Sequence, residues 1–198
     1  MTATSQSHAA AGHPRTLGEL PIGRVGMWWF LASEIMVFGG LLGAYILSRI
    51  AHGGWTEEMT HLNSTIAAIN TLVLVTSSLA IVQAHAAADA GDQKRTQRYL
   101  FITAALGLIF LGNKAYEYST EIHHGFTPAT STFWSYYYGM TGLHGIHVFA
   151  GIVWIFALAV AVGRPSWHAI RQRVEYAGLY WHFVDVVWIF LFPLLYLS

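Results

Sequence analysis

Five long, mostly apolar segments separated by short polar loops constrain the fold of this 198-residue chain more than any other feature. A helix needs about 20 mostly apolar residues to cross the hydrocarbon core of a bilayer, and each segment reaches that length. Glycine, proline and charged residues gather in the loops, as in HGGWTEEMTH and GRPSWHAIRQR. The sequence therefore predicts an all-α integral membrane protein, a bundle of five transmembrane helices with spans at about 24–50, 63–87, 98–120, 133–163 and 174–197.

The composition supports one membrane domain over residues 24–198. Only 10% of the residues are charged and 55% are hydrophobic, whereas a soluble domain has about 25% charged residues. The net charge is zero, so nothing indicates a nucleic-acid partner. Residues 1–23 are small and polar and lack the apolar stretch of a signal peptide, so we expect a flexible cytoplasmic N-terminal tail.

The lysines and arginines predict the orientation of the spans. Eight of the ten lie before the first span, between the second and third, or between the fourth and fifth; the other two are Arg49 and Lys114. Because cytoplasmic loops carry the excess of basic residues, we expect the N terminus inside and the C terminus outside. Lys114 lies about 24 Å of helix beyond Arg98, and we expect its long side chain to reach the outer interface.

Glycines recur at helical spacing in two of the spans. Gly39 and Gly43 form a GxxxG motif in the first span, and Gly139, Gly142 and Gly145 follow one another at intervals of three in the fourth. Such sites allow helix backbones to approach closely. We therefore expect these glycine-bearing faces to pack against other helices.

Ionisable side chains occur inside four of the spans, where they are costly and usually face protein or water. Three pairs have a spacing of three residues, which places both members of each pair on one helix face. The simplest interpretation is that these side chains form hydrogen bonds that fix helix packing. The residues are Glu34 in the first span, Lys114 and Glu117 in the third, His144 and His147 in the fourth, and His182 and Asp185 in the fifth.

Two other classes of membrane protein could use such residues. A b-type haem could be held by His147 and His182. A metalloenzyme could draw its ligands from Glu117, His144, His147, His182 and Asp185. The expected depths of these groups differ by about 10 to 15 Å, which disfavours a shared centre. The chain also has no cysteine, which excludes thiolate metal sites and iron–sulfur clusters. We therefore expect no metal site and no catalytic residue.

Several segments, in this order, resemble subunit III of the haem–copper respiratory oxidases, and the resemblance covers nearly the whole chain. They are RVGMWWFLASEIMVFGG in the first span, INTLVLVTSSLAIVQAH in the second, YEY around Glu117, TGLHGIHVFAG in the fourth span and EYAGLYWHFVDVVWIFLF in the fifth. The chain is similar to the five-helix bacterial form of this family.

The resemblance implies a cofactor-free accessory subunit of a cytochrome c oxidase in the bacterial cytoplasmic membrane. Such a subunit lies beside the catalytic subunit I, which with other partner subunits carries the haem and copper. It stabilises the catalytic subunit, supports proton uptake and binds phospholipid between its helix groups. No activity is then expected from the isolated chain.

The resemblance also implies roles for individual residues. Glu34 occupies the position of a buried family glutamate close to the lipid cleft, and Arg24 matches the basic residue that begins this helix, so both are expected to support lipid binding or proton uptake. The expected buried polar packing positions are His85, Glu117, His144, His147, Glu175, His182 and Asp185.

Similar subunits also accompany quinol oxidases and nitric oxide reductases, so these complexes are the alternatives. Quinol oxidases often have aspartate at the position of Glu34 and phenylalanine at that of Tyr180. The residues present here favour the cytochrome c oxidase type.

Overall fold

A computed structural model describes residues 22–164 and 171–197. Five of the helices in this part of the chain are long and apolar enough to cross a membrane, as predicted. The expected N-terminal tail, apart from its last two residues, lies outside the described residues. The helices are α1 (Ile22–Ala51), the short α2 (Thr56–Thr60), α3 (Ser64–Asp89), α4 (Gln93–His123), α5 (Thr132–Val162) and α6 (Arg171–Tyr196).

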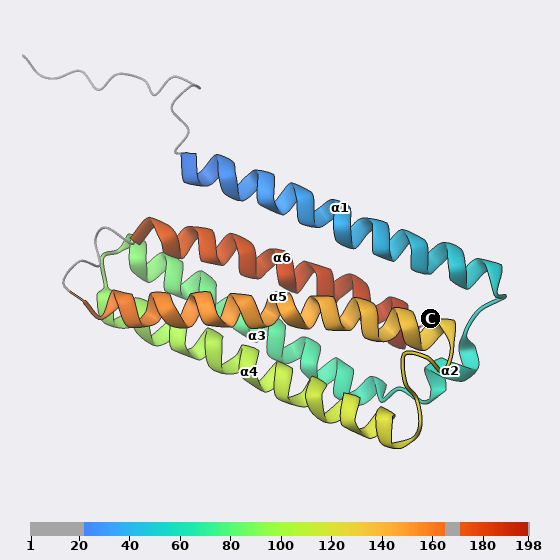
Figure 1. Cartoon of the computed structure of the whole chain (residues 1–198). Helices are drawn as coiled ribbons and strands as arrows, with labels where there is room; N and C mark the ends of the chain where they lie inside the picture. The colour runs from blue at the N-terminus through green and yellow to red at the C-terminus, as the bar shows by residue number, and fades with distance from the viewer. Residues whose placement is uncertain (1–21, 165–170, 198) are drawn as a thin grey trace, which may run out of the picture.

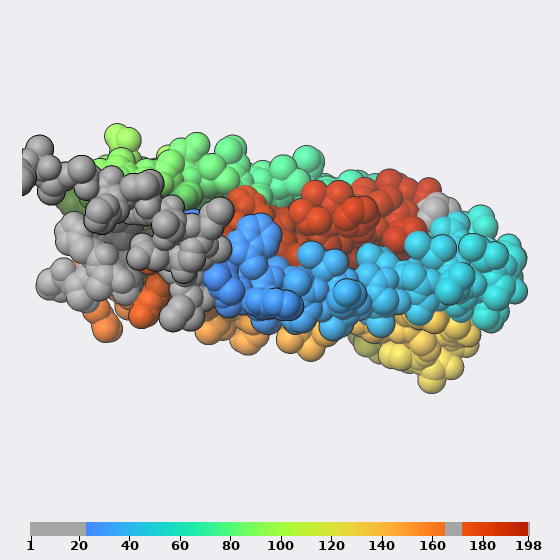
Figure 2. Space-filling view, turned by 90° about the horizontal axis from the view of Figure 1, so that it is seen from above, coloured from blue at the N-terminus to red at the C-terminus, as the bar shows by residue number. Residues whose placement is uncertain are grey.

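The long helices divide into a four-helix bundle and one peripheral helix (Figure 1). Helices α3, α4, α5 and α6 pack side by side, and the main contacts of α1 are with α5 and α6. The space-filling view shows α1 as an exposed row along the bundle between α6 and α5 (Figure 2). The N-terminal end of α1 lies at the same end of the bundle as the α3–α4 turn, which is the arrangement that five consecutive spans require.

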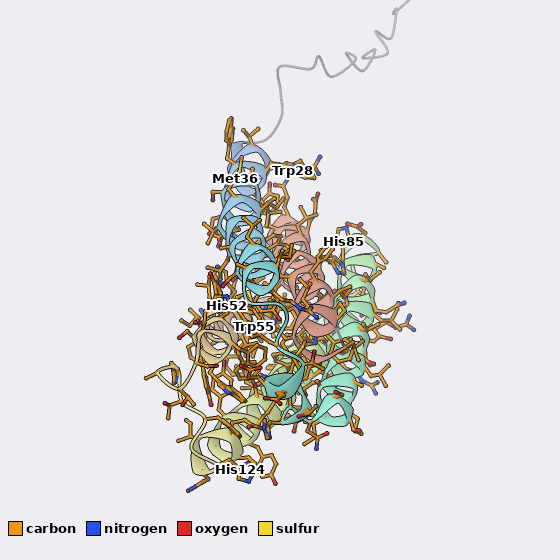
Figure 3. All side chains as sticks on the ribbon, turned by 90° about the vertical axis from the view of Figure 1, so that its right-hand side faces the viewer. Trp28, Met36, His52, Trp55, His85 and His124 are labelled. Atoms are coloured by element: carbon orange, nitrogen blue, oxygen red, sulfur yellow. The ribbon has the colours of Figure 1, made fainter. Side chains whose placement is uncertain are left out.

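A seven-residue repeat attaches α1 to the bundle. Its buried residues in the described part are Leu31, Phe38 and Tyr45, with exposed fractions of 7%, 3% and 0%. A repeat of seven keeps one narrow face of a helix against its neighbours. Most of the other side chains of α1 are exposed and apolar: Trp28 and Met36 lie on its outer side (Figure 3) and are 60% and 80% exposed.

Aromatic side chains and two glycines organise the core of the four-helix bundle. Trp181 of α6 lies against Gly107 of α4 and Gly151 of α5, where an added Cβ would come within 2.8 Å of its ring. Its indole Nε1 donates a hydrogen bond to the Ser77 hydroxyl at 2.9 Å. These glycines are therefore required because a large buried side chain occupies the space beside them.

The glycines of the GxxxG motif and of the fourth span have a different environment. Among the described residues, nothing lies within 4 Å of a Cβ added at Gly39, Gly43 or Gly139. At Gly142 and Gly145 the nearest atoms, in Tyr118 and Leu111, are at ordinary van der Waals distance. Close packing thus occurs at Gly107 and Gly151, whereas Gly39, Gly43 and Gly139 stay open among the described residues.

Side-chain caps and glycines with positive φ define the helix ends. The Asn63 side chain accepts hydrogen bonds from two backbone amides at the start of α3, and Asp92 accepts one at the start of α4. Such caps satisfy amides that have no partner within a helix. Gly53 and Gly54, with φ of 74° and 102°, form the turn between α1 and α2, a conformation that favours residues without a Cβ.

Candidate functional site

Glu34, near the middle of α1, links this peripheral helix to the bundle. Its Oε2 lies 3.1 Å from Nε2 of His147 on α5, and each side chain is 16 to 17% exposed. The two residues are separated by 113 positions in the sequence. The partner of Glu34 thus comes from another helix, and α1 and α5 are joined by a polar contact inside an otherwise apolar seam.

The neighbours of His147 determine what this contact can do chemically. The ring Nδ1 lies 2.9 Å from the Leu143 carbonyl, which can only accept, so Nδ1 carries a hydrogen. The contact between Nε2 and Glu34 then needs one further proton, on either the imidazole or the carboxyl. Phe38 packs edge-on against the imidazole at 5.2 Å, and Tyr180 donates to the His147 carbonyl.

Arg24 and Glu175 form a second link between α1 and the bundle. Nη2 of Arg24 lies 2.7 Å from Oε1 of Glu175 at the start of α6, and the side chains are 40% and 26% exposed. Gly23 lies beside the Tyr176 ring. The residue associated by resemblance with lipid binding is thus paired with one expected to have a packing role.

Lys114 and Glu117 form the centre of a buried cluster near the far end of the bundle. They are 7% and 3% exposed, and Nζ of Lys114 donates to Oε2 of Glu117 at 3.0 Å. Nζ also donates to the hydroxyls of Tyr137 and Tyr196, at 3.1 and 2.8 Å. The expectation that Lys114 reaches the interface is wrong, because its ammonium group turns into the core, where these acceptors satisfy it.

The same cluster satisfies the glutamate and joins three helices. Oε1 of Glu117 accepts hydrogen bonds from Tyr137 of α5 and Tyr196 of α6, at 2.9 and 2.5 Å. The spacing of Lys114 and Glu117 indicated their contact, but the two tyrosines come from distant segments. The one signal that favours Tyr137 is its position seven residues before His144, on the same face of α5.

His144 and His147 share a helix but point to different neighbours. His144 is 1% exposed; its ring stacks on Trp188 at 5.2 Å and meets the edge of Phe110 at 5.6 Å. Neither ring nitrogen has a hydrogen-bond partner among the described residues. Within residues 22–164 and 171–197, no group of three His, Cys, Asp or Glu side chains is arranged to hold a metal ion.

His182 and Asp185 lie on the α3 side of α6. Nδ1 of His182 is 2.6 Å from the Ser78 hydroxyl of α3. Asp185 is 5% exposed, and neither of its carboxyl oxygens has hydrogen-bond geometry to a described residue, although Ser78 is close by. A buried carboxyl without a hydrogen-bond partner is costly. In this respect Asp185 differs from Glu117, whose two carboxyl oxygens both accept hydrogen bonds.

His85 lies at the edge of the bundle near the end of α3 (Figure 3). Its side chain is 42% exposed, and Nε2 lies 3.6 Å from Asp89 one turn later. The structure therefore gives His85 only partial burial, unlike the core positions of Glu117 and His144.

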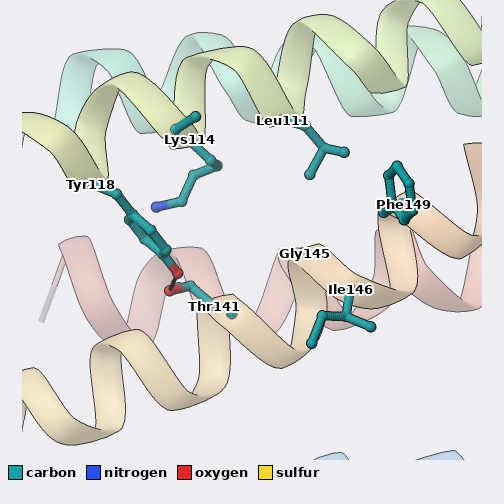
Figure 4. A pocket seen from close by; sticks show the side chains of 9 residues that line it. Leu111, Lys114, Tyr118, Thr141, Gly145, Ile146 and Phe149 are labelled. Carbon is teal, nitrogen blue, oxygen red and sulfur yellow. Dashed lines mark hydrogen bonds between the residues drawn. The ribbon is translucent and has the colours of Figure 1, made fainter.

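Two hollows on the surface of the bundle lie along α5. One, of about 310 Å³, lies between α4 and α5 and includes the Lys114 stem, Gly145 and Phe149 (Figure 4). At one end of it, Tyr118 and Thr141 share a hydrogen bond of 2.5 Å. The other, of about 260 Å³, lies between α1 and α5 and is lined by Leu41, Ser135, Tyr136, Gly139 and Met140.

Five helices of membrane-spanning length, joined by polar contacts such as Lys114–Glu117 and Glu34–His147, define a polytopic helical membrane protein. Comparison with known sequences refines this class. The chain belongs to the cytochrome c oxidase subunit III family, whose family model matches residues 16–198. The resemblance predicted from the sequence is confirmed.

Curated relatives from bacteria support this assignment over most of the chain. The chain is 41% identical over 175 residues to cytochrome c oxidase subunit 3 of Thermostichus vulcanus, covering 87% of this chain and 86% of the relative. It is 38% identical over 177 residues to a probable cytochrome c oxidase subunit 3 of Nocardia farcinica, with coverages of 87% and 86%. It is 36% identical over 195 residues to cytochrome c oxidase subunit 3 of Synechocystis, covering 97% of this chain and 80% of the relative.

Family membership establishes the general character of the chain. It is a multi-pass membrane subunit of the respiratory chain, homologous to subunits in the bacterial cytoplasmic membrane. The family carries no metal centre of its own, and its partners are the other oxidase subunits.

Proposed function

We propose that this chain is the accessory subunit of a bacterial cytochrome c oxidase, that it stabilises the catalytic subunit and supports its proton uptake, and that it binds structural phospholipid. The main observation behind the proposal is the contact between Glu34 and His147. It fixes the spacing between α1, which has few contacts with the bundle, and α5. Haem and copper belong to the partner subunits. This chain contributes a helical surface for the catalytic subunit and binding sites for lipid.

The hollow between α1 and α5 suits an acyl chain. It is lined mainly by apolar side chains and by Gly139, which leaves its floor open. Leu41, on its α1 wall, lies two helical turns beyond Glu34. Loss of the contact to His147 would loosen both walls, so Glu34 supports lipid binding indirectly.

The open glycine faces are the proposed contact with the catalytic subunit. Gly39 and Gly43 of α1 have no neighbour within 4 Å of an added Cβ among the described residues. A helix of another subunit can approach such a surface closely. The bias of basic residues further leads us to propose that the N terminus is inside.

The test of the Glu34 role is a substitution in the intact oxidase. We expect Glu34→Ala to leave initial turnover near the wild-type rate, but to shorten the lifetime under continuous turnover and to reduce retained phospholipid. Glu57→Ala, in the exposed α2, is the matched control and should change neither quantity. Wild-type lifetime together with wild-type lipid content in Glu34→Ala would refute this role.

The assignment to a cytochrome c oxidase is tested by identifying the subunits that co-purify with the chain. Purification in mild detergent, followed by mass spectrometry of the co-purifying chains and a haem spectrum, should recover a haem–copper oxidase that oxidises cytochrome c. Recovery with a quinol oxidase or a nitric oxide reductase would contradict the proposal and support the alternative complexes.

A further inference from the structure

Two arginines lie near the ends of the apolar stretch of α1. Arg24 follows its first residues and Arg49 is in its last turn, and 25 residues of helix correspond to about 37 Å. A bilayer has a hydrocarbon core of about 30 Å and measures about 40 to 45 Å with its headgroups. The spacing of the two arginines along α1 is therefore close to the distance between the two phosphate layers of a bilayer.

The two arginines differ in their protein partners. Arg24 forms the ion pair with Glu175. Among residues 22–164 and 171–197, no carboxylate lies within ion-pair distance of Arg49, and no described side chain accepts a hydrogen bond from it. Its side chain is nevertheless partly buried. The charge of the Arg49 guanidinium is therefore not compensated by a carboxylate of the described residues, and an anion from outside the chain can bind there.

A hollow of about 410 Å³ adjoins Arg49 where α1 crosses the end of α6. Arg49, Ile46 and Ile50 form its α1 wall, Leu194 of α6 lies opposite, and Gly54 borders it at the turn. Gly54 has φ of 102° and no side chain, so the headgroup end stays open. The volume is in the range of ligand pockets, about 300 to 1,000 Å³. The hydrogen bond from Tyr45 to the Leu194 carbonyl, at 2.9 Å, holds the two helices together there.

We propose that this hollow binds a glycerophospholipid, with its phosphate on the Arg49 guanidinium and the upper part of one acyl chain between Ile46 and Leu194. The charge of the guanidinium and the apolar walls below it match the two parts of such a lipid. A guanidinium can bind phosphate through two parallel hydrogen bonds. The site lies at the opposite end of α1 from Arg24 and does not depend on the role proposed for Glu34.

The experiment is native mass spectrometry of the full-length chain, titrated in detergent with dioleoylphosphatidylglycerol. We expect Arg49→Gln to weaken binding of one lipid about five-fold, because one basic residue near a charged membrane surface has about that effect. Arg49→Lys should lose less, because the charge remains. Ile46→Trp should weaken binding about four-fold or more by filling the apolar part of the hollow, at unchanged charge.

Arg98→Gln is the matched control, because it removes an exposed arginine at the other end of the bundle and should leave the titration unchanged. Dioleoylglycerol, which lacks the phosphate, should bind far more weakly than the phospholipid. Equal affinity of wild type and Arg49→Gln would overturn the proposal, as would equal binding of the two lipids. Unchanged binding in Ile46→Trp, with competition by millimolar inorganic phosphate, would also overturn it, since the site would then bind a phosphate ion only.

Discussion

The core of the bundle contains two carboxyl groups with opposite surroundings. Glu117 accepts hydrogen bonds from Lys114, Tyr137 and Tyr196 and joins three helices. Asp185 is buried almost as deeply, yet neither of its oxygens has hydrogen-bond geometry to a described residue. Burial alone therefore does not tell what a polar residue contributes to a membrane bundle. Removing a charge that has hydrogen-bond partners leaves those partners unsatisfied. Removing the Asp185 carboxyl leaves no other group unsatisfied.

The largest effect that follows from this difference is expected for Lys114→Ala. It leaves Glu117 as a buried charge without its cation, and loss of one partner of a buried pair costs about 3 to 5 kcal/mol. The measurement is the free energy of unfolding in mixed micelles, followed by tryptophan fluorescence. Lys94→Ala, at an exposed position, should lie within about 0.5 kcal/mol of wild type. A loss below about 1 kcal/mol in Lys114→Ala would refute the importance of the pair.

Tyr196→Phe should have the next largest effect. It removes the hydroxyl that bonds both Lys114 and Glu117, and hydrogen bonds to charged groups contribute about 1.5 to 3 kcal/mol. The same unfolding measurement applies. Tyr116→Phe, whose ring is 64% exposed, is the control. Equal stability of the two variants would show that the Tyr196 hydroxyl is not part of a cooperative cluster.

The double variant Lys114→Met with Glu117→Gln sharpens the comparison. It removes both charges while the glutamine carbonyl still accepts from the tyrosines, so we expect a net loss of only about 1 kcal/mol. The double-mutant cycle with the two single variants should then give a clear coupling energy. Additive losses would mean that the ion pair is not the interaction that stabilises the cluster.

Asp185→Asn should have the smallest effect, of opposite sign to the variants above. It replaces a carboxyl group without a hydrogen-bond partner by a neutral side chain of the same shape, so stability should stay unchanged or rise by about 1 kcal/mol. Glu117→Gln is the matched isosteric change in the saturated cluster and should lower stability. Destabilisation of Asp185→Asn by more than Glu117→Gln would reverse our view of the two regions.

Sequence patterns predicted the five spans because hydrocarbon thickness imposes a length on each apolar segment. They located α4 less well: it begins at Gln93, within a charged stretch, because the capped helix extends beyond the membrane-sized apolar part. The contact of Lys114 with Glu117 follows from helical spacing, but the depth of the lysine does not. Its burial depends on tyrosine hydroxyls from α5 and α6, which local spacing cannot place.

The partner of Glu34 could not be predicted for the same reason. Its nearest basic neighbour in sequence is Arg24, which instead binds Glu175, and the group that meets the carboxyl is His147 on another helix. The spacing of His144 and His147 suggested a shared role. The structure directs one ring to α1 and the other to an aromatic site, because positions three apart differ by about 60° around a helix.

The seam of Leu31, Phe38 and Tyr45 has a consequence for biogenesis. Helix α1 is synthesised before α5 and α6, with which it has its main contacts. Until those spans are inserted, α1 must remain in the bilayer without its docking surface, and its large apolar circumference makes this possible. Docking of α1 therefore follows the insertion of α5 and α6, although α1 itself is made before them.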